Sequence, residues 1–437
     1  MIFGPALYPM LWVLAKTLWS EYQKRPPLWF SYEPEPFPEV SYVPGVCDVY
    51  RPDVFTGCED IKVYGDYAIV SCDPYKKQSN FLTGYKAGTP SGAVYIWNYV
   101  ADSEPVQIEF GDDFGELRPQ GVRGIFTNEH ETTLRIFVTN AAGKGNASVE
   151  VFDFTPSTGK IDRFLSLPHG KAILDPVSVV PISATQVFTA NTLGYPYRGV
   201  LSYLEALSGM PFGTIGYLDF TNVSNITEKS VGASTTPIGI EYHGDKLYVA
   251  SAQYGIYSYQ LYIPPDDITD EQVAENKSLG RMHFYPGEEI FRTPYLPLHL
   301  SYSTELDGLV SAGANSVLGQ VLSWLSSKKR KAASWAGLLV QLGDLVVADS
   351  VTSALKDKDR KWQTVFWDKT GDKFSGLNSL VVENGRRFGV SLHDQGVLIC
   401  NTNGLEEVIV PEQEDLEQEI DKKNNDKLEH LYLKSEL

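Results

Sequence analysis

The stretch GCEDIKVYGDYAIVSCDP, residues 57–74, has the pattern of a β-hairpin with two adjacent carboxylates at its start. Apolar and polar residues alternate before Gly65 and an apolar run follows it, as expected for two antiparallel strands joined by a tight turn. Glu59 and Asp60 stand side by side just before the first strand. Because neighbouring carboxylates repel each other, the pair is either solvated at a turn or neutralised by a cation.

Similar hairpins recur along the chain. A short apolar strand, a polar turn and a second strand ending in small residues appear six times, beginning at Asp60, Gly121, Asp175, Pro237, Pro297 and Leu377. Successive starts are about 55 to 80 residues apart, which is the spacing of propeller blades with long loops. Strand-like runs such as 92–100 and 147–154 lie between them and supply outer strands. We therefore expect an all-β, six-bladed β-propeller in preference to a β-sandwich.

The composition excludes one class of partner. The chain has 437 residues with 37 Lys+Arg against 55 Asp+Glu, which gives a net charge of −18. A surface of this sign repels phosphate backbones, so we expect no nucleic-acid partner. All-β propellers of this length occur as single domains, so one large domain is expected.

The two ends differ from the repeats. An apolar run over residues 1–15 predicts an N-terminal hydrophobic helix, either buried or retained as a membrane anchor after serving as an entry signal. We assign residues 1–45 to this leader and a Pro-rich linker, residues 46–404 to the propeller, and residues 405–437 to a charged, acidic C-terminal tail ending in KSEL.

Three features of the sequence indicate the lumen of the endoplasmic reticulum or the secretory pathway. The leader is one, and the terminal KSEL, which resembles the KDEL-type retrieval signal, is another. The third is a set of four glycosylation sequons, at Asn146, Asn222, Asn225 and Asn276.

Four cysteines permit three pairings in such an oxidising compartment: Cys47, Cys58, Cys72 and Cys400. Cys47 precedes the first repeat and Cys400 ends the last, where closure of a ring would bring the two ends together. We therefore predict a Cys47–Cys400 bridge. Cys58 and Cys72 lie symmetrically about Gly65, so they are either paired across the hairpin or both free.

From about Cys47 to Cys400 the chain resembles the serum paraoxonase and arylesterase family, six-bladed propellers related to gluconolactonases and strictosidine synthases. In that family a cysteine lies about a dozen residues before a Glu-Asp pair and bridges to a cysteine near the end of the last blade; Cys47, CEDI and GVLIC fall in those places. Further motifs follow in the family's order, namely LRPQGVRGIF, IFVTNAAGKGNASVEVFDF, DPVSVV, VFTANTLGY and PIGIEYHGDKLYVASA.

The resemblance implies calcium as a cofactor. Family members hold two calcium ions in the central tunnel, so Glu59 would face the catalytic ion, Asp60 the structural ion, and Asp175 would be a further ligand. The family's remaining ligands fall at or beside Ile238 and Leu298, whose side chains carry no oxygen.

The catalytic positions of the family also differ here. Its histidine in a PHG motif is replaced by Gln120, and its partner histidine by Ala141, which follows Asn140. Gln120 and Asn140 are therefore pocket candidates and no catalytic residue is assigned, although His299 and His393 could supply a base from elsewhere.

Two functions follow from the sequence. The first is a lumenal, paraoxonase-like hydrolase of small esters or lactones, in which a tunnel metal polarises the carbonyl. The alternative is a catalytically inactive propeller that binds an unidentified lumenal partner, since propellers serve both purposes.

Overall fold

We describe the fold from a computed structural model of the chain. The described residues are 47–76, 88–110, 115–128, 130–142, 146–193, 205, 211–252, 255–262, 283–291, 293, 296–314, 331–341, 360–368, 370–393 and 395–401. The expected N-terminal helix, the acidic tail and the sequon at Asn276 lie outside these residues. Among the residues described, no helix has the length and apolar character needed to cross a membrane.

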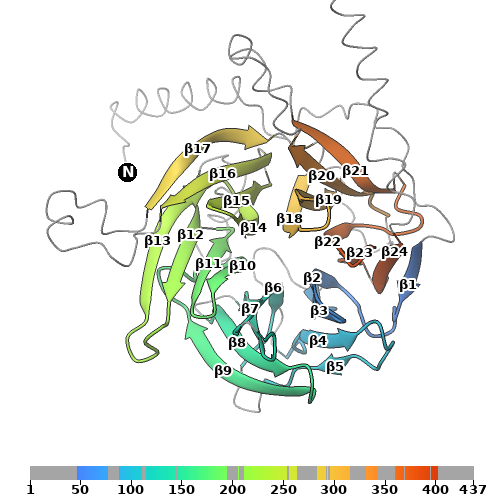
Figure 1. The fold of residues 1–437 in the computed structure, drawn as a ribbon, viewed down its shortest axis with the longest axis horizontal. Coiled ribbons are helices and arrows are strands. Elements are labelled where there is room, and N and C mark those ends of the chain that lie inside the picture. The colour runs from blue at the N-terminus through green and yellow to red at the C-terminus, as the bar shows by residue number, and fades with distance from the viewer. Residues whose placement is uncertain are drawn as a thin grey trace, which may run out of the picture.

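The structure is a ring of six antiparallel sheets of four strands each, which confirms the predicted six-bladed propeller. Five blades are formed by consecutive strands, as Figure 1 shows. These are β2 (Cys58–Tyr64), β3 (Tyr67–Cys72), β4 (Ala93–Asn98) and β5 (Val106–Gln107); β6 (Pro119–Phe126), β7 (Leu134–Asn140), β8 (Ser148–Thr155) and β9 (Lys160–Pro168); β10 (Pro176–Ser183), β11 (Gln186–Asn191), β12 (Gly213–Asp219) and β13 (Thr227–Ser234); β14 (Pro237–His243), β15 (Lys246–Ser251), β16 (Gly255–Tyr262) and β17 (His283–Phe291); β18 (Leu296–Ser303), β19 (Gly308–Ala314), β20 (Ser334–Gln341) and β21 (Arg360–Asp368).

The sixth blade joins the two ends of the described chain. It contains β22 (Leu377–Glu383), β23 (Arg386–Ser391) and β24 (Val397–Asn401), and its outermost strand is β1 (Cys47–Tyr50). Cys47 lies opposite Cys400 in the β1–β24 register, and the two form a disulfide. This confirms the predicted bridge, which links strands at opposite ends of the sequence.

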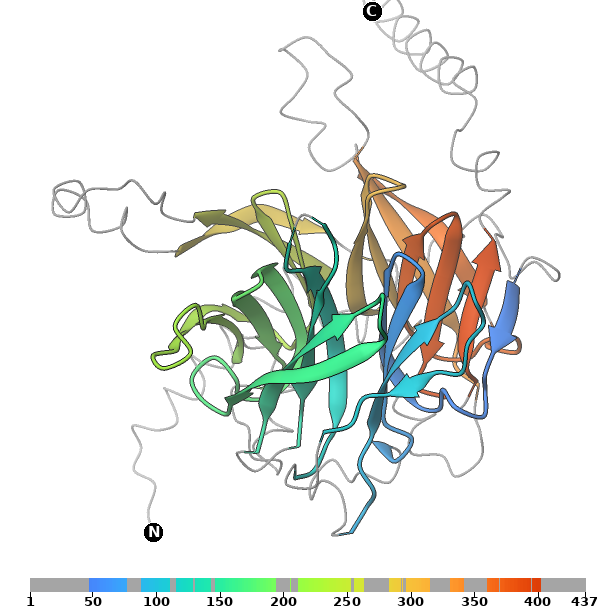
Figure 2. The same cartoon turned by 60° about the horizontal axis from the view of Figure 1, so that its bottom comes forward.

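In each of the five blades made of consecutive strands, the first strand lies nearest the axis. In the sixth blade this inner strand is β22. Each inner strand contacts the inner strands of both neighbouring blades, so β2, β6, β10, β14, β18 and β22 form a closed ring. Figure 2, in which the ring is tilted, shows the sheets packed face to face around the axis. Buried apolar side chains fill the spaces between blades; Trp97, Phe55 and Phe388, for example, belong to one cluster shared by the first and last blades.

The opening stretch forms the β2–β3 hairpin. Its turn is at Gly65, which adopts a φ of 56°, a conformation that glycine accepts without steric cost. Cys58 lies opposite Cys72 in the register and forms the second disulfide, so the two cysteines left open by the sequence are paired.

Three of the four sequons are described, and all are at the surface. Asn146 is exposed between β7 and β8, and Asn222 and Asn225 are exposed between β12 and β13. These positions are sterically open to a glycan, and glycosylation itself stays a prediction.

Candidate functional site

The same irregularity occurs at the beginning of all six inner strands. The pairing with the second strand shifts register between Cys58 and Asp60, and at the equivalent place in the other five blades. A bulge of this kind inserts a residue and interrupts the alternation of side chains between the two faces of the strand. Glu59 contacts Asn378 on β22 and Asp60 contacts Val122 on β6, so the adjacent side chains reach the blades on either side of their own.

Asp60 joins its own blade to the blades on either side. Its carboxylate accepts hydrogen bonds from the backbone N–H of Val122 on β6 (3.1 Å) and from the hydroxyl of Ser379 on β22 (2.6 Å). It also accepts a hydrogen bond from the N–H of Ile61 (3.0 Å) and lies 3.1 Å from Nζ of Lys62. Three of these donors contact Oδ1 and one contacts Oδ2, so both oxygens of Asp60 are engaged within the protein.

Two cations extend across the propeller axis. Arg123 on β6 pairs with Glu241 on β14 at 2.6 Å and donates to the carbonyl of Leu300 on β18, while its Nη1 lies 3.8 Å from Asp60. The ammonium of Lys62 on β2 lies 3.4 Å from the same Leu300 carbonyl. Because β2, β6 and β18 belong to blades that are not all neighbours, these contacts can form only near the axis.

Glu59 has a cation of its own. Its Oε1 contacts Nζ of Lys76, which follows β3, and its Oε2 accepts a hydrogen bond from Nδ2 of Asn378 on β22 at 3.2 Å. The Lys76 ammonium also donates to Oε1 of Gln120 at 3.0 Å. Burial raises the pKa of Glu59, and the positive charge of Lys76 opposes that shift.

One histidine belongs to this region. His299 on β18 is buried, and its Nδ1 lies 3.7 Å from Oδ1 of Asp60. Burial lowers the pKa of His299, while the Asp60 carboxylate opposes the change, so the imidazole is neutral near pH 7. We call the buried or partly buried set Glu59, Asp60, Lys62, Lys76, Arg123, Glu241 and His299 the axial charge cluster.

The axial charge cluster does not fit a calcium ion. Calcium requires about six to eight oxygen ligands at roughly 2.3–2.6 Å, whereas the oxygens of Asp60 are occupied by four donors and those of Glu59 by Lys76 and Asn378. Asp175 lies before β10, where its N–H donates to Asn191. Among the described residues, no three His, Cys, Asp or Glu side chains are grouped so as to hold a metal. Calcium binding stays a prediction, and no catalytic step is derived from it.

The two residues expected to line a pocket, Gln120 and Asn140, lie on different strands of the same blade. Gln120 belongs to the inner strand β6 and accepts a hydrogen bond from Lys76. Asn140 ends the second strand, β7, where its Oδ1 accepts a hydrogen bond from the N–H of Arg118 at 2.7 Å and its Nδ2 donates to Ser148 at 3.3 Å. Asn140 therefore fixes the end of its blade and also lines a polar cavity of about 390 Å³ beside β8 and β9, together with Asn146 and Glu150.

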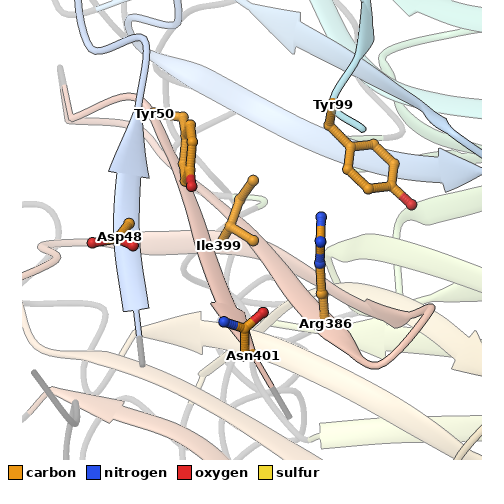
Figure 3. A pocket seen from close by; sticks show the side chains of 6 residues that line it. All are labelled: Asp48, Tyr50, Tyr99, Arg386, Ile399 and Asn401. Atoms are coloured by element: carbon orange, nitrogen blue, oxygen red, sulfur yellow. The ribbon is translucent and has the colours of Figure 1, made fainter. Parts of the chain in front are cut away.

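A smaller cavity lies at the closure of the ring. It has a volume of about 130 Å³ and is lined by Asp48, Tyr50, Tyr99, Arg386, Ile399 and Asn401. Figure 3 shows the Arg386 side chain directed toward Tyr99, and its guanidinium carbon lies 5.7 Å from the centre of that ring. Ligand sites commonly have about 300–1,000 Å³, so this cavity is small for a substrate.

Sequence reasoning missed four members of the axial charge cluster. Lys62, Arg123 and Glu241 interrupt the apolar runs of their inner strands, and this signal was available in the sequence because charged residues are rarely buried unless they are paired. Lys76 lies just after the second cysteine of the hairpin, and nothing in its local sequence distinguishes it from a solvated lysine.

Comparisons with known proteins give a likeness of fold. No family model matches the chain, and no curated protein matches it. Among solved structures, a putative 6-phosphogluconolactonase from Bacteroides uniformis is 12% identical, with a TM-score of 0.37, over 70% of this chain and 86% of that one. A catalytically inactive virginiamycin B lyase from Staphylococcus aureus, solved with quinupristin, is also 12% identical, with a TM-score of 0.38, over 81% of this chain and 98% of that one. The sheet topology of the structure itself identifies the chain as a six-bladed β-propeller, and membership of the paraoxonase family stays a prediction.

Proposed function

We propose that this protein is a hydrolase of small esters or lactones in the endoplasmic reticulum lumen or secretory pathway, with His299 as its general base. The observation that carries the proposal is the Asp60–His299 pair, held at 3.7 Å beside the cations of the axial charge cluster. A neutral imidazole next to a carboxylate and within reach of positive groups is an arrangement that suits attack of water on a carbonyl.

The chemistry assigned to this arrangement is a direct hydrolysis. His299 accepts a proton from water as the water oxygen attacks the carbonyl carbon of the substrate, and the Asp60 charge stabilises the imidazolium that forms. The oxyanion then collapses, the bond to the leaving oxygen breaks, and the imidazolium returns the proton to that oxygen. Lys76 is the most exposed of the three cations, with 23% of its side chain accessible, so we assign it to the developing oxyanion.

The location in the secretory pathway has separate support. Two disulfides persist best in an oxidising compartment, and three described sequons are exposed. With the terminal KSEL, these features favour the endoplasmic reticulum lumen. Attachment to a membrane through residues 1–15 is part of the same proposal.

A second candidate function is a propeller without catalysis that binds a lumenal partner. The observation that favours it is that four donors of the protein itself contact the Asp60 carboxylate. A buried polar network of this kind stabilises the fold whether or not a reaction takes place.

Hydrolysis assays on two variants separate these functions. A panel of aryl esters and lactones is offered to the parent protein, to His299→Gln and to His130→Gln, which removes an exposed histidine from the β6–β7 connection. We expect His299→Gln to lower kcat by about 10²-fold or more and His130→Gln to leave it unchanged. Equal rates in parent and His299→Gln would remove His299 from the mechanism, and a parent that hydrolyses nothing in the panel would favour the binding protein.

A further inference from the structure

The buried carboxylates near the axis are balanced by side chains of the protein itself. The axial charge cluster contains three carboxylates, Glu59, Asp60 and Glu241, and three side-chain cations, Lys62, Lys76 and Arg123. A buried charge is tolerated when it is paired and hydrogen-bonded. Because the described pairs already balance, a calcium ion would add two uncompensated positive charges.

The adjacent carboxylates use different cations. Asp60 faces Lys62 and Arg123, whose side chains are 5% and 7% exposed. Glu59 pairs with Lys76, which lies just after β3 and has a side chain that is 23% exposed. The first pairing is therefore sealed inside the propeller, whereas the second is at its edge.

The position of the Lys76 ammonium is defined by oxygen atoms. It contacts Oε1 of Glu59 and lies 3.0 Å from Oε1 of Gln120, and Asn378 is bound to the other oxygen of Glu59. A carboxylate oxygen and an amide oxygen, as Glu59 and Gln120 supply here, are also ligands that a hard divalent cation prefers. The ammonium thus stands where a small cation would otherwise find its ligands.

We propose that Lys76, with Lys62 and Arg123, supplies the positive charge that the Glu59–Asp60 pair requires, so that the propeller folds without calcium, and that Lys76 occupies a latent cation site. Removing the ammonium would leave the oxygens of Glu59 and Gln120 accessible to a cation from the solvent. This inference does not depend on the proposed hydrolysis, because it concerns the binding of calcium and the stability of the fold.

Calcium titration of the parent protein and of Lys76→Met tests the proposal. By calorimetry the parent gives no saturable calcium binding up to about 10⁻² M, whereas Lys76→Met binds with a Kd of about 10⁻⁴ to 10⁻³ M, as weak natural calcium sites do. By thermal unfolding the parent has the same Tm in calcium and in chelator, within about 1 °C. Lys76→Met melts lower than the parent in chelator, because Glu59 is left unpaired, and calcium restores part of the loss.

Two matched variants control for unspecific effects. Lys160→Met removes an equal charge from the outer strand β9, where Lys160 is paired with Asp162 at the surface, and it should bind no calcium. The double variant Lys76→Met/Glu59→Gln removes both partners and should lose the calcium response. If Lys76→Met does not fold in chelator, its refolding with calcium and with magnesium replaces the melting experiment, and recovery by calcium alone is the expected result.

Several results would overturn the proposal. A parent protein that binds calcium, or whose Tm rises with it, contains a metal site that Lys76 does not block. A Lys76→Met variant that is as stable as the parent in chelator and does not respond to calcium shows that the ammonium neither neutralises Glu59 nor occupies a cation site. Recovery by neither ion in the refolding experiment shows that the ammonium does not occupy a cation site.

Discussion

Replacing Asp60 with asparagine should destabilise the propeller substantially and independently of calcium. The substitution preserves the shape of the side chain but removes the negative charge that faces Lys62 at 3.1 Å and Arg123 at 3.8 Å. It also introduces an amide group with two donors among neighbours that themselves donate, namely Ser379 and Val122. Removing one partner of a buried ion pair typically costs about 3–5 kcal/mol, and we expect Asp60→Asn to fall in this range.

The expected loss corresponds to a measurable shift in melting. For a domain of about 350 residues, 1 kcal/mol changes the Tm by roughly 1–2 °C, so the Tm should fall by about 5 °C. Differential scanning calorimetry in calcium and in chelator should give the same decrease. Asp162→Asn, which removes a surface partner of Lys160, should change the Tm by less than about 1 °C. A decrease confined to the calcium sample would refute the reasoning, because it would make Asp60 a metal ligand.

Three further predictions concern closure, strand packing and pH. Cys400→Ser removes the bridge across 353 residues, so it should lower the free energy of unfolding by about 5 kcal/mol and leave Cys47 reactive with maleimide. A bridge from Cys47 to another cysteine in peptide maps of the parent protein would contradict this. Gly239→Ala places a Cβ 2.7 Å from the Leu298 carbonyl and should cost about 1–3 kcal/mol by urea unfolding, whereas Gly115→Ala, with open space around it, should cost almost none. The lowered pKa of His299 means that the unfolded chain takes up its proton first, so parent stability should fall as pH drops through about 6.5, and His299→Gln should show a smaller fall.

The propeller could be predicted because its signal is repeated and local. Six similar hairpins, each with a strand, a tight turn and a second strand, are visible in the sequence, and their number and spacing determine a ring. Ring closure by Cys47 and Cys400 followed from the positions of these residues at the two ends of the array, and both are where the prediction placed them.

The axial charge cluster could be predicted only in part. The sequence shows that Glu59 and Asp60 need positive charge, and Lys62 lies on the same strand, but Arg123 and His299 come from β6 and β18. Contacts between such distant segments are fixed only when the ring closes. The bulges were also hidden, since a period of two places adjacent side chains on opposite faces of a strand. The resemblance led to expected metal ligands, whereas the structure places Lys76 on Glu59, and Lys62 and Arg123 beside Asp60.

A crystal structure of the parent protein grown with calcium would show whether Lys76 or a metal ion neutralises Glu59. We expect Nζ of Lys76 to lie between Glu59 and Gln120, Lys62 and Arg123 to face Asp60, and no ion to be bound to either carboxylate. An anomalous peak beside Glu59 or Asp60, surrounded by about six to eight oxygens at roughly 2.3–2.6 Å and with Lys76 displaced, would contradict it.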